Sequence, residues 1–360
     1  MYKRQHLDRG RCERILGEQV QDGIEHGVAV AVPSCRATIR RDLLHHVDLR
    51  PAPSDPVPDN KWHASGHNYA VAMTDWTSLS ARASFASHRL IGWIYWDPGA
   101  IERYTALGVP DGFGYYVASR GAPLAPAGHQ AVAAAFYSIH PGFIEMCLTV
   151  AAQHTTFDQI IAARDAAVGE GLRAHAPEIC DGLAELGPQL WAAADALPVS
   201  GRVLFAAHRQ CPRPEDPVVS AWLAVNCIRE WRGDTHFAVL TAADLSGTQA
   251  GVLHNAHLNY PEQWIPRSRG ADDDALGAAL AELEARGLAD DGRVNAAGLA
   301  LRAEIETTTD RLCERAWRLL GVDATERFLY LVEPAGEQLL SRIDQTAGEH
   351  WMPAARERRS

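Results

Sequence analysis

The sequence predicts a mainly α-helical protein, in which a multi-helical N-terminal domain precedes a winged helix-turn-helix domain with a small β-wing. Two observations predict this fold. Apolar residues recur at helical spacing through most of the chain, and one short hairpin pattern lies near its C-terminus. The regular alternation of strands and helices that indicates a parallel sheet is missing from the sequence. We expect an N-terminal extension (1–83), a helical domain (84–240), a winged-helix domain (241–322) and a C-terminal helix or tail (323–360).

The N-terminal extension carries the weakest pattern. Residues 12–30 are compatible with a helix, whereas PAPSDPVP at 51–58 predicts an extended, proline-rich linker. Two interpretations stay open for residues 1–83: an additional folded element, or a start site assigned too early.

The helical domain begins with two helices in SFASHRLIGWIYWDPGAIERYTALG (84–108). They separate at Asp97-Pro98, because proline is well suited to the first turn of the second helix. The segment 200–209 is compatible with either a helix or a strand. A strongly apolar helix is expected at 218–231, and Arg232-Gly233-Asp234 predicts a break before another helix that ends near residue 243. Further helices are expected at 129–138, 142–152, 156–174 and 177–195.

The winged-helix domain is predicted from local signals. Ser246 can cap a helix that runs through His257. A second helix follows the acidic caps at 272–274, because Leu276, Leu280 and Leu283 share one of its faces, and Gly287 ends it. Asp291-Gly292 is the tip of a hairpin, and a long helix runs from residue 296 to Gly321. Helix, hairpin and long helix in this order predict a winged helix.

LEARGLADDGRVNAAGLALRAEIE (283–306) resembles the second half of a MarR-type winged helix, with Asn295 where that family usually has threonine. More widely, the chain resembles a mainly actinobacterial family described as helix-turn-helix, over about residues 84–325. The resemblance implies a helical, regulator-type protein and no particular activity. The segments that carry it are WDPGAIERYTALGV (96–109), YYVASRGAPL (115–124), AAFYSIHPGFIE (134–145) and IREWRGDTHFAVL (228–240).

Composition predicts a soluble, cytoplasmic protein. The 47% hydrophobic and 22% charged residues are typical of a globular chain, and no segment is apolar over the length that a membrane span needs. Residues 1–30 lack the apolar core of a secretory leader. Seven scattered cysteines without a C-x-x-C pair indicate reduced thiols.

DNA binding is the first functional hypothesis, and the charge pattern argues against it. Our DNA-binding candidates are Arg267, Arg269, Arg286 and Arg293, of which Arg293 lies at the predicted wing tip. The predicted recognition helix is acidic, and residues 267–315 hold eleven acids against seven arginines, a poor match for a phosphate backbone. The winged helix is therefore either a weak groove binder or a scaffold.

Two residue groups are candidates for a small-molecule site. Arg232, Asp234 and His236 follow a predicted helix end, and could bind an anionic ligand or hold a general base. The alternative is a structural corner between helices, with Asp234 as a cap. Aromatic residues and an arginine beside a Gly/Pro-rich loop are typical of a pocket wall or of plain core. This second group comprises Tyr116, Arg120, Tyr137 and His140.

No metal site and no cofactor is predicted. His254 and His257, like His63 and His67, lack a third ligand at an informative spacing. Nucleophile-elbow, P-loop and dinucleotide-binding motifs are missing from the sequence, so an enzyme is not favoured.

The primary hypothesis is a small-molecule-responsive transcriptional regulator, expected as a homodimer, with a weak or degenerate DNA-binding surface. The alternative is a small-molecule-binding protein or enzyme whose winged helix is structural. In that alternative Arg120, His140, Arg232 and His236 would converge on one cavity.

Overall fold

The computed structural model describes residues 74–356. These residues all belong to one compact unit. The predicted helix within 12–30, the linker at 51–58 and the pair His63 and His67 lie outside the described residues. The described part is mainly helical, with one two-stranded sheet.

The first described helix, α2 (Trp76–Gly92), starts before the expected domain boundary at residue 84. A short 3-10 turn follows, and α3 (Pro98–Thr105) begins where the sequence predicts. The Asp97 side chain accepts a hydrogen bond from the backbone N–H of Ala100 at 3.1 Å, and Pro98 occupies the first helical position. The predicted break at Asp97-Pro98 is confirmed.

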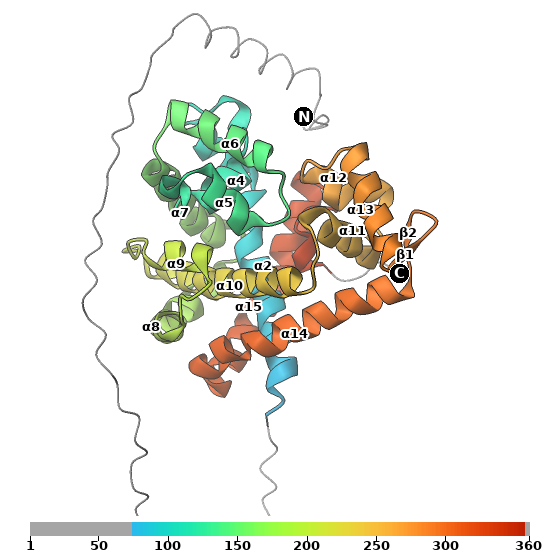
Figure 1. Cartoon of the computed structure of the whole chain (residues 1–360). Coiled ribbons are helices and arrows are strands. Elements are labelled where there is room, and N and C mark those ends of the chain that lie inside the picture. The colour runs from blue at the N-terminus through green and yellow to red at the C-terminus, as the bar shows by residue number, and fades with distance from the viewer. Residues whose placement is uncertain (1–73, 357–360) are drawn as a thin grey trace, which may run out of the picture. The chain divides into compact units, whose positions relative to one another are not determined.

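The helices expected at 129–138, 142–152, 156–174 and 177–195 are present within a few residues of those bounds, whereas the helix at Tyr115–Gly121 was not expected. Of the ambiguous segment 200–209, Val203–Arg209 forms a helix. The longest of these helices is α10, against which α8 and α9 pack (Figure 1). In order they are α4 (Tyr115–Gly121), α5 (His129–Phe136), α6 (Pro141–His154), α7 (Phe157–His175), α8 (Cys180–Ala196), α9 (Val203–Arg209) and α10 (Pro217–Ala242).

The predicted break at Arg232-Gly233-Asp234 is wrong, because α10 continues through it without interruption. A glycine in a helix costs only about 1 kcal/mol, which tertiary packing can offset. Asp234 is not an N-cap of a following helix. It is buried, and its carboxylate accepts a hydrogen bond from the backbone N–H of Phe205 at 2.9 Å, in the first turn of α9.

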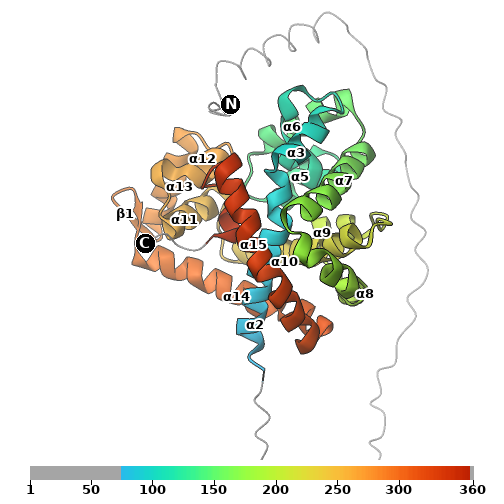
Figure 2. The ribbon, with the colours of Figure 1, turned by 180° about the vertical axis from the view of Figure 1, so that it is seen from behind.

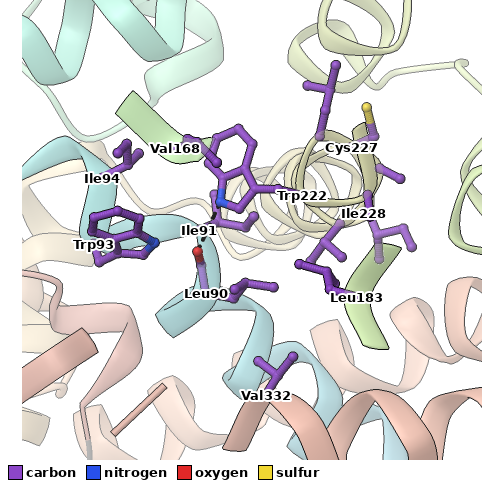
Figure 3. Close-up of a cluster of buried hydrophobic side chains, with 14 of the residues drawn as sticks. Leu90, Ile91, Trp93, Ile94, Val168, Leu183, Trp222, Cys227, Ile228 and Val332 are labelled. Carbon is purple, nitrogen blue, oxygen red and sulfur yellow. Dashed lines mark hydrogen bonds between the residues drawn. The ribbon is translucent and has the colours of Figure 1, made fainter. Parts of the chain in front are cut away.

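The hydrophobic core forms where α2, α7, α8 and α10 meet (Figure 3). From Val218 to Ile228 every residue of α10 except Ser220 is buried, as expected for a helix enclosed on all sides. Trp222 of α10 is fully buried, and its indole N–H donates to the carbonyl oxygen of Leu90 at 3.0 Å. This bond satisfies the one polar atom of a large buried side chain and fixes α10 against α2.

The C-terminal part contains α11 (Gly247–Leu258), α12 (Trp264–Ser268) and α13 (Asp273–Ala285). A hairpin of β1 (Ala289–Asp290) and β2 (Arg293–Val294) follows, with antiparallel pairing and Asp291-Gly292 at its turn. The long helix α14 (Ala296–Leu320) then starts at the Asn295 cap and stops at Gly321. The predicted capped helix, hairpin and long helix are confirmed as elements.

α14 connects this part to the rest of the described chain. It contacts α11 and β2, and also packs against α2, α8 and α10. The last helix, α15 (Val322–Thr346), lies across α2 (Figure 2), so a helix occupies most of the segment where a C-terminal helix or tail was expected. The proposed boundary between domains at about residue 240 stays a prediction.

None of the helices described between residues 74 and 356 combines the length and apolar character that a membrane crossing requires.

Candidate functional site

Arg120 on α4 and Glu230 on α10 form a buried ion pair. The guanidinium Nε lies 2.9 Å from Oε1 of the carboxylate, and Nη2 lies 2.7 Å from Oε2, so the pairing is bidentate. Arg229 also donates to Oε1 of Glu230, at 2.6 Å, and Arg120 donates to the Tyr116 hydroxyl at 3.0 Å. Burial raises the pKa of Glu230, but Arg120 and Arg229 outweigh it and hold the pKa below its ordinary value. Glu230 is therefore ionised.

Asp234 lies one helical turn after Glu230 and has a different environment. Burial raises its pKa to about 7, and the charge of Glu230 adds to the rise, while the hydrogen bond from Phe205 opposes it. Its hydrogen bond goes to Phe205 rather than to Arg232 or His236. The side chain therefore caps α9 and does not orient the other two candidates.

Arg232 and His236 face α14. Arg232 Nη2 lies 3.0 Å from Glu306 and 2.8 Å from Asp310, and its Nη1 is 3.5 Å from Nε2 of His88 on α2. His236 Nδ1 is 3.1 Å from the Thr309 hydroxyl, and its Nε2 is 4.0 Å from Glu306. Polar side chains from three helices therefore meet here.

Two further arginines extend this group. Arg302 Nη2 lies 3.4 Å from Glu306, and Arg269, which follows α12, donates to the Ser138 hydroxyl at 2.9 Å. Burial lowers the pKa of His254 on α11, and the positive charges of Arg302 and Arg269 lower it further. We call this group the inner polar cluster. Its members are His88, Arg232, His236, His254, Arg269, Arg302, Glu306 and Asp310.

The inner polar cluster is partly open to solvent. The Arg232 side chain is 13% exposed, His236 23% and Glu306 29%. Burial nevertheless lowers the pKa of His236 to about 4, with a further contribution from Arg232, while Glu306 opposes the shift. Burial likewise places the pKa of His88 well below its ordinary value. The cluster therefore presents neutral imidazoles beside charged guanidinium groups at neutral pH.

The other candidate residues serve in local contacts. Tyr137 stacks on Phe237 with ring centroids 5.3 Å apart, and its hydroxyl donates to the carbonyl oxygen of Leu245. His140 is exposed and accepts a hydrogen bond from the backbone N–H of Gly142 at the start of α6. Hence Arg120, His140 and the Arg232/His236 pair take part in three separate sets of contacts rather than one.

Most of the DNA-binding candidates are engaged within the chain. Arg267 pairs with Asp273 at 2.6 Å, and Arg269 belongs to the inner polar cluster. Arg286 donates to the carbonyl oxygens of residues 243 and 244 at the end of α10. Arg293, at the turn of the hairpin, is exposed and has no ion pair among residues 74–356. The exposed acids of α13 and its cap are Asp272, Asp273, Asp274, Glu282 and Glu284.

The sequence pattern missed several members of the cluster, and one signal could have found some of them. Arg302, Glu306 and Asp310 recur every four residues, which places them along one side of α14. His88 and His254 carry no comparable local signal. In the described range no group of three or more His, Cys, Asp or Glu side chains could hold a metal ion.

The model of a helix-turn-helix family matches residues 80–345. The chain belongs to this helix-turn-helix family. The match starts within α2 and ends within α15, so it includes the buried Arg120–Glu230 pair, every member of the inner polar cluster and the hairpin. Comparison with curated proteins and with solved structures gives no match.

Proposed function

We propose that this member of the helix-turn-helix family binds a small molecule at the inner polar cluster. In this proposal the segment from α11 to α14 is a winged helix that forms one side of the binding site and does not read DNA. The order of α11, α12, α13, hairpin and α14 supports the winged helix. A MarR-like relationship is part of the same proposal.

One observation carries the proposal: the arginines of the C-terminal part are used inside the protein. Arg269 and Arg302 join the inner polar cluster, and Arg286 caps α10. Meanwhile the outer face of α13, which would have to enter the major groove, presents carboxylates. Carboxylates repel phosphates, and base edges are read mainly by Arg, Lys, Asn and Gln.

The cluster favours binding over acid–base catalysis. A general base works best when its pKa lies near the operating pH. The pKa of His236 is about 4, which makes it a weak base at neutral pH. Its Nδ1 already contacts the Thr309 hydroxyl, so the ring is held as part of the binding surface.

A second candidate function is transcriptional regulation through DNA. Two observations favour it: membership of the helix-turn-helix family and the exposed Arg293 at the hairpin turn. A DNA-binding form would be a two-fold dimer with the hairpins about 34 Å apart, one helical turn of DNA.

A thermal-unfolding screen of the full chain tests the ligand-binding proposal. The panel contains organic acids, phosphate esters, neutral sugars and amines, each at several concentrations. A ligand that binds the folded state raises the melting temperature with concentration, and we expect this from at least one class. A panel in which every compound leaves the transition unchanged would contradict the proposal.

A further inference from the structure

The C-terminal part of the described chain has a hydrophobic core of its own, built by the end of α10, the loop that follows, α11, α13, β1 and α14. Its buried members are Leu240, Leu245, Val252, Leu253, Leu276, Leu283, Ala289 and Ile305. Among residues 74–356, Tyr137 is the one hydrophobic side chain from before α10 that packs against this core. We call the segment from α11 to β2 the C-terminal lobe. Tyr137 is therefore a contact between this lobe and the helices that precede α10.

Tyr137 follows α5 in a backbone conformation that side chains rarely adopt. Its φ is 56° and its ψ is −61°, and the backbone N–H of Ser138 donates to the carbonyl oxygen of Phe136 at 2.6 Å. These values describe a γ-turn with a positive φ at its centre, which is the rare and strained form of this turn. Such a conformation persists only where the surrounding structure imposes it.

Contacts at the start of the C-terminal lobe hold Tyr137 in this conformation. Its ring stacks on Phe237 with centroids 5.3 Å apart, and its hydroxyl donates to the carbonyl oxygen of Leu245. Its own carbonyl oxygen lies against the first residue of α11, because a Cβ on Gly247 would be 2.3 Å from it. A residue without a Cβ is what allows α11 to approach the turn so closely.

The residues after Tyr137 contact the loop between α12 and α13. The Ser138 hydroxyl accepts a hydrogen bond from Nη1 of Arg269 at 2.9 Å. The backbone N–H of His140 donates to the carbonyl oxygen of Arg269, also at 2.9 Å. A Cβ on Gly270 would lie 2.8 Å from the Cβ of His140, so the two backbones are close here as well. Residues 137–140 therefore contact the C-terminal lobe both at the start of α11 and after α12.

We propose that residues 137–140 act as a latch that closes the C-terminal lobe onto the helices before α10, and that the strain at Tyr137 allows the latch to open. In the closed state the contacts of the turn offset its strain. In the open state the turn relaxes, and the lobe stays attached through the packing of α11 on α14. Strained backbone occurs in switch regions because it brings two states close in free energy. The opening needs no ligand, so it is independent of the proposed small-molecule function.

Hydrogen–deuterium exchange of the full chain, measured by mass spectrometry, tests this latch, because amide exchange reports local opening. Tyr137→Ala and Tyr137→Gly lose the same side-chain contacts and differ only in how the backbone tolerates the turn. We expect both variants to exchange faster than the wild type in α11, α13 and the hairpin, with α2, α7 and α8 unchanged. In the lobe, Tyr137→Ala should exchange about threefold faster than Tyr137→Gly or more, because glycine adopts a positive φ without strain.

Gly247→Ala tests the latch from the side of the lobe and leaves the Tyr137 side chain in place. The added methyl group would press on the backbone of the turn, so exchange in the lobe should rise by about fivefold or more. Gly277→Ala is the matched control. It makes the same change in α13, where nothing lies within 4 Å of the new methyl group, and should not raise exchange in the lobe.

Tyr137→Phe covers the case in which a larger change prevents folding. It removes only the hydroxyl that donates to Leu245, and should raise exchange in the lobe alone. Exchange that rises equally in the lobe and in α2, α7 and α8 would indicate global unfolding and overturn the latch. The latch would also be disproved if Tyr137→Gly exchanged as fast as Tyr137→Ala or faster, or if the lobe stayed fully protected in Gly247→Ala and Tyr137→Phe.

Discussion

At the residue scale, Arg120 and Glu230 form the most deeply buried ion pair among residues 74–356. Both side chains are almost fully buried, at 6% and 1% exposure. Glu230→Gln would leave Arg120 and Arg229 without their carboxylate, and we expect a loss of about 3–5 kcal/mol in the free energy of unfolding, measured by urea denaturation. The exposed pair Arg82–Glu333 supplies the control, where Glu333→Gln should cost less than about 1 kcal/mol. Equal losses in the two variants would contradict this account.

Asp234 makes the stability of the folded protein depend on pH. Its pKa is about 7 in the folded state against an ordinary 3.8, because burial favours the protonated carboxyl. Between these values the folded state keeps a proton that the unfolded state has released, so stability falls as the pH rises through this window.

Asp234→Asn should remove this dependence, because the amide oxygen can still accept from Phe205 and cannot ionise. We expect the wild type to lose about 1–4 kcal/mol relative to the variant between pH 4 and 7.5, measured by urea denaturation across that range. Parallel stability curves for the two proteins would show that Asp234 does not titrate as described.

Single residues could be selected from the sequence, but their partners could not. Arg120 stands out because a buried arginine must be paired, yet its partner Glu230 lies 110 positions away. Likewise the Arg232–His88 contact joins residues 144 positions apart. Local patterns identify which side chains need a partner, whereas only the packing of α2, α4, α10 and α14 determines which partner each one meets.

At the scale of elements, two glycines on helices provide a matched test of the packing around the hairpin. A Cβ on Gly298, in the first turn of α14, would lie 2.3 Å from the backbone oxygen of Leu288 and 2.7 Å from a Val294 methyl. Gly298→Ala should therefore destabilise the protein by about 2 kcal/mol or more, since a backbone atom cannot easily move away.

Gly277, in the middle of α13, has nothing within 4 Å of the corresponding position. Gly277→Ala should stabilise the protein by about 0.5–1 kcal/mol through helix propensity alone. Thermal and urea unfolding of the two variants measures both effects. Stabilisation by Gly298→Ala would disprove the close packing of α14 on the residues that flank the hairpin.

Elements were predictable where their signals are local. The Asp272 and Asn295 caps and the Asp291-Gly292 turn fix α13, the hairpin and the start of α14 to within a residue or two. The prediction of a break within α10 failed. Gly233 and Asp234 are break signals by composition, but burial of the helix and the contact from Asp234 to α9 keep it continuous.

At the scale of the whole molecule, net charge and packing both argue against DNA binding. The chain carries a net charge of −11, and three of the four DNA-binding candidate arginines are bound to other parts of the protein. The acidity of α13 could be seen in the sequence. The contact of Arg269 with Ser138 could not, because it joins residues 131 positions apart.

Fluorescence anisotropy of a labelled generic duplex, titrated with the full chain at low and moderate salt, shows whether the protein binds DNA. A generic sequence suffices, because the phosphate contacts of a DNA-binding surface are independent of sequence. We expect no saturable binding even at low salt, for the wild type and for Arg293→Ala alike. Binding that weakens steeply with salt, and that Arg293→Ala reduces, would contradict it and identify the hairpin as a DNA-contacting wing.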